Sequence, residues 1–328
     1  MGFKLADISF KHGLCLAPMA GYTDRAMRRI CHDFGAEYSV TEMVSAKAVT
    51  YGDKKTLPLA RILADEGPCA VQIFGSEPCI MAEAAGILIE KAEIKPIAID
   101  INMGCPVNKI FSNGEGSALM RNPALISDIV SAVHRAIDIP VTVKLRAGVD
   151  KDHINAVECA LAAEEAGASL VCIHGRTRVQ MYGGFADREI IKNVKSALHI
   201  PVIANGDILS GADAVSMLSD TGADGIAVGR GAVGNPFLFS EITCALENRA
   251  YSEPEISERI NAALLQLSLA IEEKGETVAV TEARKQIALY LRSFRGAAKI
   301  RAKINRALTY KEVADALYSA LLEEENET

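Results

Sequence analysis

The chain has 328 residues, of which 49% are apolar and 23% are charged, and its formal net charge at pH 7 is −7. This length and apolar content suit one large domain with a smaller one, and they exclude a disordered chain. No apolar stretch approaches the roughly 20 residues that a membrane-spanning helix requires, and the first ten residues lack the apolar segment of a secretory signal. We therefore expect a cytoplasmic protein with no membrane partner.

The eight cysteines lie far apart in the sequence and form no Cys-x-x-Cys pair. This pattern argues against a disulfide framework and against a zinc site, so no metal is predicted. Reduced thiols are expected, and most of them, such as Cys172 in SLVCIHG, suit small core residues.

Eight short apolar runs, many of them rich in β-branched residues, recur along the chain. They cover residues 13–19, 36–43, 69–75, 98–104, 140–148, 169–176, 201–207 and 225–230. The segments between them carry apolar residues at helical spacing, as in NAVECALAAEEAGA. Eight parallel strands separated by helices close most naturally as a (β/α)8 barrel, the TIM barrel of the α/β class. A doubly wound sheet is the alternative.

A barrel builds its active site at the carboxyl ends of its strands, so polar residues should gather there. They do, as Gln72, Asp100, Asn102, Lys144, Arg146, His174, Arg176, Asn205, Asp207 and Arg230. Cys105 also follows a predicted strand, between Gly104 and Pro106, which turn the chain. A thiol at this point is placed for chemistry rather than for packing.

The last two predicted strands end in NGD (205–207) and GRGAVGNP (229–236), whose glycines let backbone N–H groups approach a ligand. In this fold these two loops are the usual phosphate site, although glycines required only by tight turns would give the same pattern. GRGAVG also matches G-x-G-x-x-G, but no further strand follows it, which argues against a dinucleotide-binding unit. Lys144 could form a Schiff base, contact a phosphate or lie beside an electron-rich ring, and His174 could be an acid, a cofactor contact or a core residue.

Strand signals disappear after about residue 250. ISERINAALLQLSLAIEEKG and EARKQIALYLRSFRGAAKIRAKINRAL instead predict amphipathic helices, so we expect a catalytic barrel over 1–250 and a helical domain over 251–328. Residues 283–311 contain nine basic residues and no acidic one. Removing these nine charges from the total of −7 leaves −16 for the rest of the chain. An acidic body joined to a basic patch indicates a nucleic-acid partner, for which Arg292, Arg295 and Lys299 are candidate contacts.

Seven of these segments together resemble the tRNA-dihydrouridine synthases, in the same order and at similar spacing. They are APMAGYTD (17–24), QIFGSEP (72–78), DINMGCPVNKI (100–110), VKLRAG (143–148), IHGRTR (173–178), ANGDI (204–208) and GIAVGRGA (225–232). The resemblance covers residues 14 to about 245 and is strongest to the bacterial B-type subfamily. YLRSFRGAAKIR in the basic segment is also similar to that subfamily's C-terminal region.

The resemblance implies a flavoenzyme in which FMN lies across the barrel mouth and NADPH reduces it. It assigns Pro18, Met19 and Ala20 to the flavin ring, Gln72 and Lys144 to its polar edge, and His174 beside it. It assigns the ribityl phosphate to Asn205, Gly206, Asp207, Gly229 and Arg230.

The resemblance also implies that Cys105 protonates C5 of a tRNA uridine while hydride from the flavin reaches C6. Asn102, Arg176 and Tyr182 are candidates for holding the uracil. Elementary chemistry agrees with this role for Cys105, because a double bond conjugated to a carbonyl needs a proton donor after hydride addition. A thiol with a reference pKa of about 8.5 is largely protonated at neutral pH. The alternative role, a thiolate nucleophile, would need an activating base, and the sequence shows no evident Cys–His pairing.

Three other functions are compatible with parts of the sequence. A barrel that interconverts free pyrimidines and their dihydro forms, such as a dihydroorotate dehydrogenase, would share the flavin site but have no evident use for the basic segment. An aldolase acting through Lys144 would be colourless, and a non-catalytic RNA-binding barrel would oxidise no NADPH. Nothing in the sequence indicates a protein partner.

Overall fold

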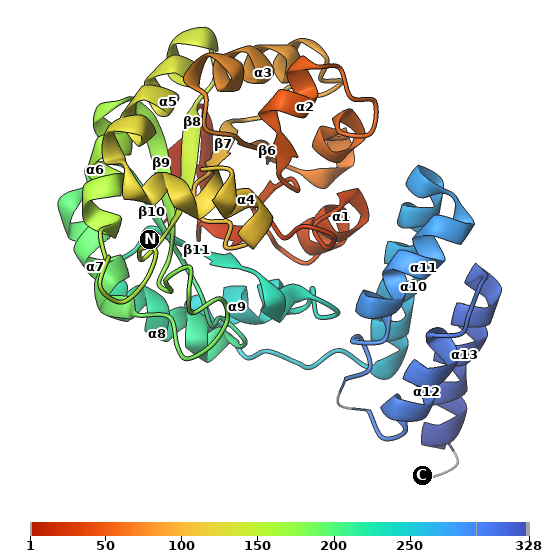
Figure 1. Ribbon diagram of the computed structural model, residues 1–328. Coiled ribbons are helices and arrows are strands. Elements are labelled where there is room, and N and C mark those ends of the chain that lie inside the picture. Colours follow the sequence, from red (N-terminus) through yellow and green to blue (C-terminus); the bar gives the residue numbers. More distant parts are fainter. Residues whose placement is uncertain (1, 293, 326–328) are drawn as a thin grey trace.

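The computed structural model describes residues 2–292 and 294–325 and contains a closed parallel barrel (Figure 1). Its eight strands are β3 (Leu14–Leu16), β4 (Tyr38–Val40), β6 (Cys69–Phe74), β7 (Ile99–Asn102), β8 (Val141–Arg146), β9 (Ala168–His174), β10 (Val202–Asn205) and β11 (Gly225–Val228). Neighbouring strands pair in parallel, and the β11–β3 and β4–β6 pairings close the ring. A short extra strand, β5 (Val44–Ser45), pairs with the end of β6. The predicted (β/α)8 barrel and all eight of its strands are confirmed.

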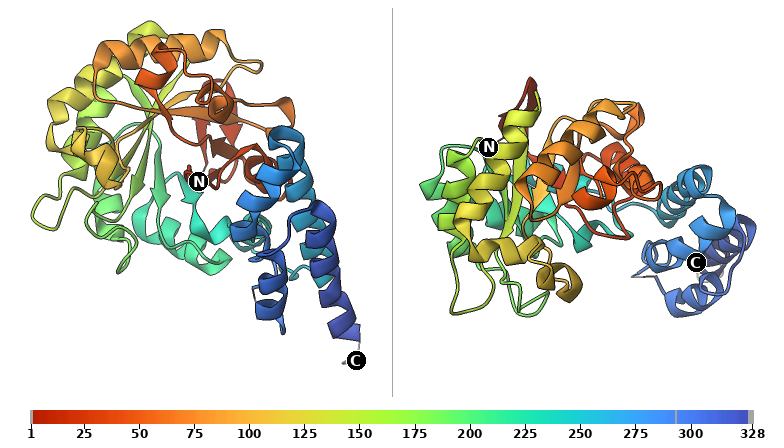
Figure 2. Two further views of the ribbon diagram at one scale, coloured as in Figure 1. Left: turned by 45° about the vertical axis from the view of Figure 1, so that its right-hand side comes forward. Right: turned by 45° about the horizontal axis from the view of Figure 1, so that its top comes forward.

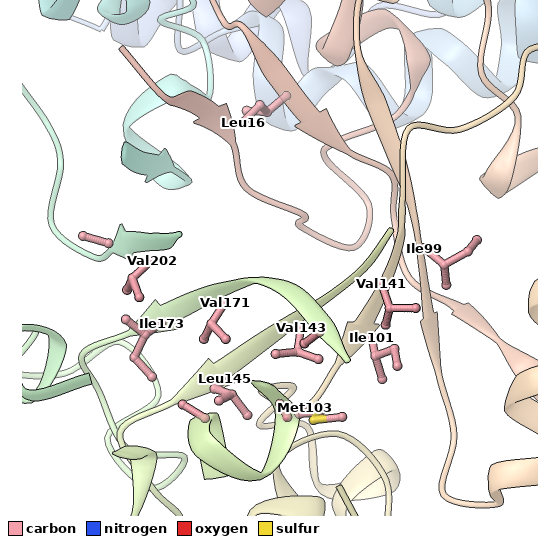
Figure 3. Close-up of a cluster of buried hydrophobic side chains, with 14 of the residues drawn as sticks. Leu16, Ile99, Ile101, Met103, Val141, Val143, Leu145, Val171, Ile173 and Val202 are labelled. Carbon is pink, nitrogen blue, oxygen red and sulfur yellow. The ribbon is translucent and has the colours of Figure 1, made fainter. Parts of the chain in front are cut away.

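Helices cover the outside of the barrel. They are α1 (Arg25–Asp33), α2 (Ala46–Thr50), α3 (Pro78–Glu90), α4 (Asn108–Ser112), α5 (Pro123–Ala136), α6 (Ala156–Glu165), α7 (Arg188–Ala197), α8 (Gly211–Thr221) and α9 (Leu238–Leu246). Local chemistry sets their ends. At the start of α5, for example, the Asn122 side chain accepts a hydrogen bond from Leu125 N, and Pro123 occupies the first helical position. Buried apolar side chains fill the layer between strands and helices, and Figure 3 shows part of it, including Val143 and Val171.

A two-stranded antiparallel hairpin that the sequence analysis did not anticipate precedes the barrel. It consists of β1 (Phe3–Leu5) and β2 (Ile8–Phe10). Its buried residues Phe3, Leu5 and Phe10 belong to the same apolar cluster as the inward-facing side chains of the barrel. Gly2 N donates a hydrogen bond to Asp224 O, just before β11 begins. The hairpin therefore closes the amino-terminal end of the barrel.

Four helices form the C-terminal region, which lies to one side of the barrel (Figure 2). They are α10 (Ile256–Lys274), α11 (Glu276–Ile287), α12 (Ala297–Ile304) and α13 (Tyr310–Glu325). The region has an apolar core of its own and a buried polar chain in which Tyr290 Oη donates to Gln266 Oε1 over 2.6 Å and Gln266 Nε2 donates to Gln286 Oε1 over 2.9 Å. The predicted helical region is thus confirmed. The proposed domain boundary near residue 250 falls between α9 and α10, and the separate roles of the two parts remain a prediction.

One detail of the C-terminal region differs from its sequence pattern. The segment 282–308 is interrupted, because α11 ends at Ile287 and α12 begins only at Ala297, after Gly296 in the left-handed conformation (φ +85°). The interruption lies against the barrel, and an added Cβ at Gly234 would fall 2.4 Å from the Cβ of Leu289. Only glycine permits this approach, so the last glycine of GRGAVG serves the packing of the helical region.

Within residues 2–292 and 294–325, no helix is both long enough and apolar enough to cross a membrane.

Candidate active site

A cavity of about 690 Å³ opens at the carboxyl ends of the barrel strands. Its wall includes every residue that the sequence analysis assigned to the cofactor: Pro18, Met19, Ala20, Gln72, Lys144, His174, Asn205, Gly206, Asp207, Gly229 and Arg230. The candidate acid Cys105 and the candidate uracil contacts Asn102, Arg176 and Tyr182 line the same cavity. Arg292 reaches it from the helical region, whereas Arg295 and Lys299 are exposed on that region and do not line it.

Parallel pairing explains why residues far apart in the sequence meet here. Gln72 lies beside Asp100 in the β6–β7 pair, and Asn102 lies beside Lys144 in the β7–β8 pair. His174 lies beside Asn205 in the β9–β10 pair. Because Arg146 also lies beside His174 in the β8–β9 pair, the polar residues at the ends of β6 to β10 form a continuous arc along the mouth of the barrel.

A chain of hydrogen bonds connects the buried Asp100 to the cysteine loop. The Asp100 carboxylate accepts hydrogen bonds from Thr142 Oγ1 over 2.5 Å and from Gln72 Nε2 over 2.6 Å. Gln72 Oε1 then accepts from Asn102 Nδ2 over 2.9 Å, and Asn102 Oδ1 accepts from Cys105 N over 2.9 Å. Because a carboxylate can only accept, it fixes which way both amides point. Asn102 is left with one N–H for a ligand.

Cys105 is held by the loop that follows it. Ser117 Oγ donates a hydrogen bond to Cys105 O over 2.7 Å, and an added Cβ at Gly116 would lie 3.0 Å from the Cβ of Cys105. Burial raises the pKa of the thiol, while the backbone N–H of Val107 and the charge of Arg146 act in the opposite direction. The described residues include no hydrogen bond between Cys105 and a histidine, so the geometry favours a proton donor over an activated nucleophile.

Lys144 and His174 lie deep in the cavity. Lys144 Nζ donates a hydrogen bond to Asn205 Oδ1 over 3.0 Å, and Asn205 Nδ2 donates to Ala227 O over 2.7 Å. Burial and the neighbouring cations Lys144 and Arg146 lower the pKa of His174 to about 2. His174 is therefore neutral at physiological pH, which argues against the acid role that the sequence left open.

Arg176 has a structural task that its sequence position did not reveal. It is almost fully buried, and its guanidinium donates to the carbonyl oxygens of Gly183 and Gly184 and to Asp207 Oδ1, the last over 2.7 Å. These bonds hold the loop that carries Tyr182 beside the cavity. A contact between Arg176 and uracil remains a prediction.

The loops after β10 and β11 have the form of an anion site. Gly206 has φ +128°, and an added Cβ would fall 2.5 Å from the Cβ of Ala186, so the position requires glycine. Burial raises the pKa of Asp207, but the hydrogen bond from Ala186 N and the charge of Arg176 outweigh it and leave that pKa low. The Arg230 guanidinium lies 4.5 Å from the centre of the Tyr182 ring and is about half exposed. Asp207 thus serves to order the loop, and its Oδ1 also lies 3.8 Å from Arg230 Nη2, while the exposed part of the Arg230 guanidinium stays accessible to an anion.

Several residues of the cavity wall had no assigned role, among them Tyr22, Met43, Arg146 and Leu289. Arg146 donates to Gly104 O over 2.8 Å and to Thr177 O over 2.9 Å, and burial lowers its pKa to about 10. Arg146 lies at the end of a predicted strand, and this position could have identified it from the sequence as a residue of the cavity wall. No such signal marked Leu289, which lies in a segment that the periodicity predicted as helix. No group of three or more His, Cys, Asp or Glu side chains in the described part of the chain is placed to hold a metal ion.

Comparisons with known proteins identify relatives along nearly the whole chain. The family model described as "Dihydrouridine synthase (Dus)" matches residues 15–326. The tRNA-dihydrouridine synthase B of Pseudomonas aeruginosa is 40% identical over 308 residues, which are 92% of this chain and 91% of the relative. The protein of the same name from Vibrio cholerae is 40% identical over 96% of this chain and 97% of its own length. A probable tRNA-dihydrouridine synthase of Rickettsia conorii is 38% identical over 98% and 97%.

Solved structures support the barrel fold. Histamine dehydrogenase from Rhizobium sp. 4-9 matches 86% of this chain with a TM-score of 0.57 and 13% identity. The 6-hydroxypseudooxynicotine amine oxidase of Pseudomonas geniculata matches 75% with a TM-score of 0.58 and 14% identity. The chain spans 50% and 49% of the length of these two proteins. At such low identity the likeness concerns the fold alone.

Proposed function

Because the chain belongs to the dihydrouridine synthase family, we propose that it reduces uridine in tRNA to 5,6-dihydrouridine, with FMN as cofactor and NADPH as reductant. The observation that carries the proposal is the position of Cys105, whose protonated thiol lines the same cavity as the candidate flavin residues. The direct test is incubation of an unmodified tRNA transcript with the purified protein and NADPH, followed by mass spectrometry of the nucleosides. A uridine that gains two hydrogen atoms supports the proposal. Oxidation of NADPH without that product would contradict it.

The residues at the two glycine loops fit a flavin phosphate. Gly229 leaves room where a side chain would otherwise project, since an added Cβ there meets no atom closer than 3.6 Å, and Arg230 supplies an accessible charge. Lys144 and Gln72 would meet the polar edge of the ring, and Pro18, Met19 and Ala20 would line its face. When bound, the reduced flavin supplies hydride to C6 of uracil.

The protein's own residues then complete the reaction at C5. Hydride addition leaves negative charge conjugated with the uracil carbonyl, and the Cys105 thiol neutralises it by giving its proton to C5. The resulting thiolate lies beside the Arg146 charge, which favours the anion. Asn102 can contribute its remaining N–H to a uracil oxygen, and Tyr182 flanks the opening.

The pH dependence of the proton transfer follows from the raised pKa of Cys105. The acid is active when protonated, so its contribution is complete below that pKa and is lost as the pH rises through it. In single turnovers with pre-reduced enzyme, the rate of dihydrouridine formation should stay constant from about pH 7 to about pH 8.5, the ordinary pKa of a thiol, and fall only at higher pH. A rate that already declines between about pH 7 and pH 8 would argue against a buried thiol as the acid.

The identity of the cofactor can be tested without any activity. Heat release of the bound flavin followed by chromatography should yield FMN, because the glycine loops and Arg230 suit a terminal phosphate. Recovery of FAD, or of no flavin from protein supplied with excess FMN, would contradict the assignment. A colourless protein would also revive the aldolase alternative for Lys144.

The helical region supports tRNA, rather than a free pyrimidine, as the substrate. A uridine must leave its surroundings in the folded tRNA to reach this cavity, at a cost of a few kcal/mol, so contacts distant from the base are required. Residues 283–311 carry nine basic and no acidic side chains, and Arg292 from this segment lines the cavity. A dihydroorotate-type enzyme has no use for such a surface.

A further inference from the structure

A second cavity of about 640 Å³ opens on the barrel rim, beside the loop that follows Cys105. Ser45, Lys47 and Phe74 form one wall, and residues of the segment 109–115 form the other. None of its lining residues lines the 690 Å³ cavity. We call this second cavity the rim pocket.

Glu115 is the unusual residue of the rim pocket. Its side chain lines the pocket although the residue is only 6% exposed, and no hydrogen bond or ion pair holds its carboxylate in the described part of the chain. The neighbouring Lys47 forms its ion pair with Glu77, with Nζ 2.5 Å from Glu77 Oε1, although its charge also acts on the Glu115 carboxylate. The small exposed area of Glu115 lies at its carboxylate, which faces the rim pocket. Both oxygens are therefore available to accept hydrogen bonds from a ligand in the pocket.

The chemistry of the rim pocket defines that ligand. A carboxylate accepts hydrogen bonds at two oxygens, so it pairs best with two adjacent N–H donors, such as N1–H and the N2 amino group of guanine. Phe74 offers an apolar wall for the plane of a base, and the exposed Lys109 has no ion pair among the described residues and can meet a phosphate. One carboxylate and one available lysine match one nucleotide residue of an RNA chain.

We propose that the rim pocket binds a guanine of the tRNA substrate, with Glu115 accepting hydrogen bonds from the donor edge of the base and Lys109 contacting its phosphate. This inference rests on the proposed function. A nicotinamide dinucleotide fits the pocket less well, since its several phosphates would bring many negative charges next to the Glu115 carboxylate.

The position of Glu115 connects this guanine to the reacting uridine. Glu115 directly precedes Gly116, which packs against Cys105, and Ser117 holds the Cys105 carbonyl. The uridine at Cys105 and the guanine at Glu115 would therefore lie on opposite sides of one short loop. Such a pair of contacts selects a uridine by its distance from a guanine in the folded tRNA.

Nucleotide-analogue interference on the FMN-loaded protein tests the inference. A tRNA transcript is prepared with phosphorothioate-tagged inosine, which lacks the N2 amino group, at random guanosine positions. The fraction bound by wild-type protein is compared with the fraction bound by Glu115→Gln, and iodine cleavage maps the positions. We expect one guanosine at which inosine interferes with binding to wild type but not to the variant. We also expect Glu115→Gln to bind unmodified tRNA roughly 5- to 150-fold more weakly, the usual loss for one bidentate base contact.

Glu90→Gln is the matched control, because it removes an exposed carboxylate at the end of α3 that lines neither cavity, and it changes the net charge equally. It should keep the wild-type interference pattern. Identical patterns for wild type and Glu115→Gln would overturn the inference, and a loss of NADPH affinity alone in Glu115→Gln would assign the pocket to the dinucleotide instead. Failure of wild-type protein to bind tRNA at all would contradict the proposed function, so the two failures are distinguishable. Flavin content and the unfolding temperature establish that each variant is folded.

Discussion

Cys105→Ala is expected to form dihydrouridine roughly 10²- to 10⁴-fold more slowly than wild type, the usual cost of losing a general acid. The substitution removes only the proton donor, because the backbone of residue 105 holds the loop. Its carbonyl oxygen accepts a hydrogen bond from Ser117 Oγ, and its N–H donates to Asn102 Oδ1. The variant should therefore still bind FMN and accept electrons from NADPH. Stopped-flow absorbance of the flavin measures its reduction, and single-turnover product analysis measures the transfer to tRNA.

The matched control for this experiment is Cys79→Ala, because Cys79 is an exposed cysteine on α3 outside the cavity. It should match wild type in both half-reactions. Product formation by Cys105→Ala at the wild-type rate would show that another group is the acid. An equal loss of flavin reduction would show instead that the substitution had damaged the whole site.

Charge reversal on the helical region should weaken tRNA binding without affecting the flavin. In Arg295→Glu/Lys299→Glu both changes lie outside the cavity, so FMN content and NADPH-driven flavin reduction should be unchanged. If each side chain meets one phosphate, the slope of log affinity against log salt should fall by about 1.4 to 1.8. Filter binding at several salt concentrations measures both the affinity and the slope.

Lys91→Glu/Lys192→Glu is the control for net charge, because it reverses two exposed lysines on the barrel body. It should leave the salt slope at its wild-type value. Equal weakening by both double variants would indicate long-range repulsion rather than contacts, and unchanged affinity in Arg295→Glu/Lys299→Glu would move the tRNA surface to the barrel rim.

The barrel fold, and the fact that the assigned site residues would meet in one cavity, could be predicted from the sequence for a physical reason. Parallel strands that are buried on both faces leave continuous apolar runs, and parallel pairing then brings the residues that end each run to one edge. Gln72, Asn102 and Lys144 meet for this reason, although 72 residues separate the first from the last in the chain.

Other features depend on contacts that the spacing of apolar residues in the sequence does not reveal. Leu289 faces the cavity because the chain is interrupted between α11 and α12, and the apolar pattern of that segment does not reveal the interruption. The hairpin β1–β2 is too short to stand out from a loop, and it forms because the barrel end offers an apolar surface to Phe3 and Leu5. Glu115 has no distinguishing neighbours in the sequence, because the Lys47 and Phe74 side chains that line the rim pocket with it come from distant segments of the chain.

On the proposed function, the hairpin that closes the amino-terminal end of the barrel leaves the flavin with one route of access. Behind the cavity the barrel interior is packed, with a void of only about 10 Å³ around Cys15, Tyr38 and Cys172, so a bound flavin can be reached only from the mouth. Nicotinamide and uracil must then approach the cofactor through one entrance. On the proposed function the two substrates take turns, and oxidised pyridine nucleotide leaves before the uridine enters. Turnover is then a ping-pong cycle, in which NADPH first reduces the flavin and the reduced flavin then reduces the uridine. An excess of NADPH competes with tRNA for the shared entrance.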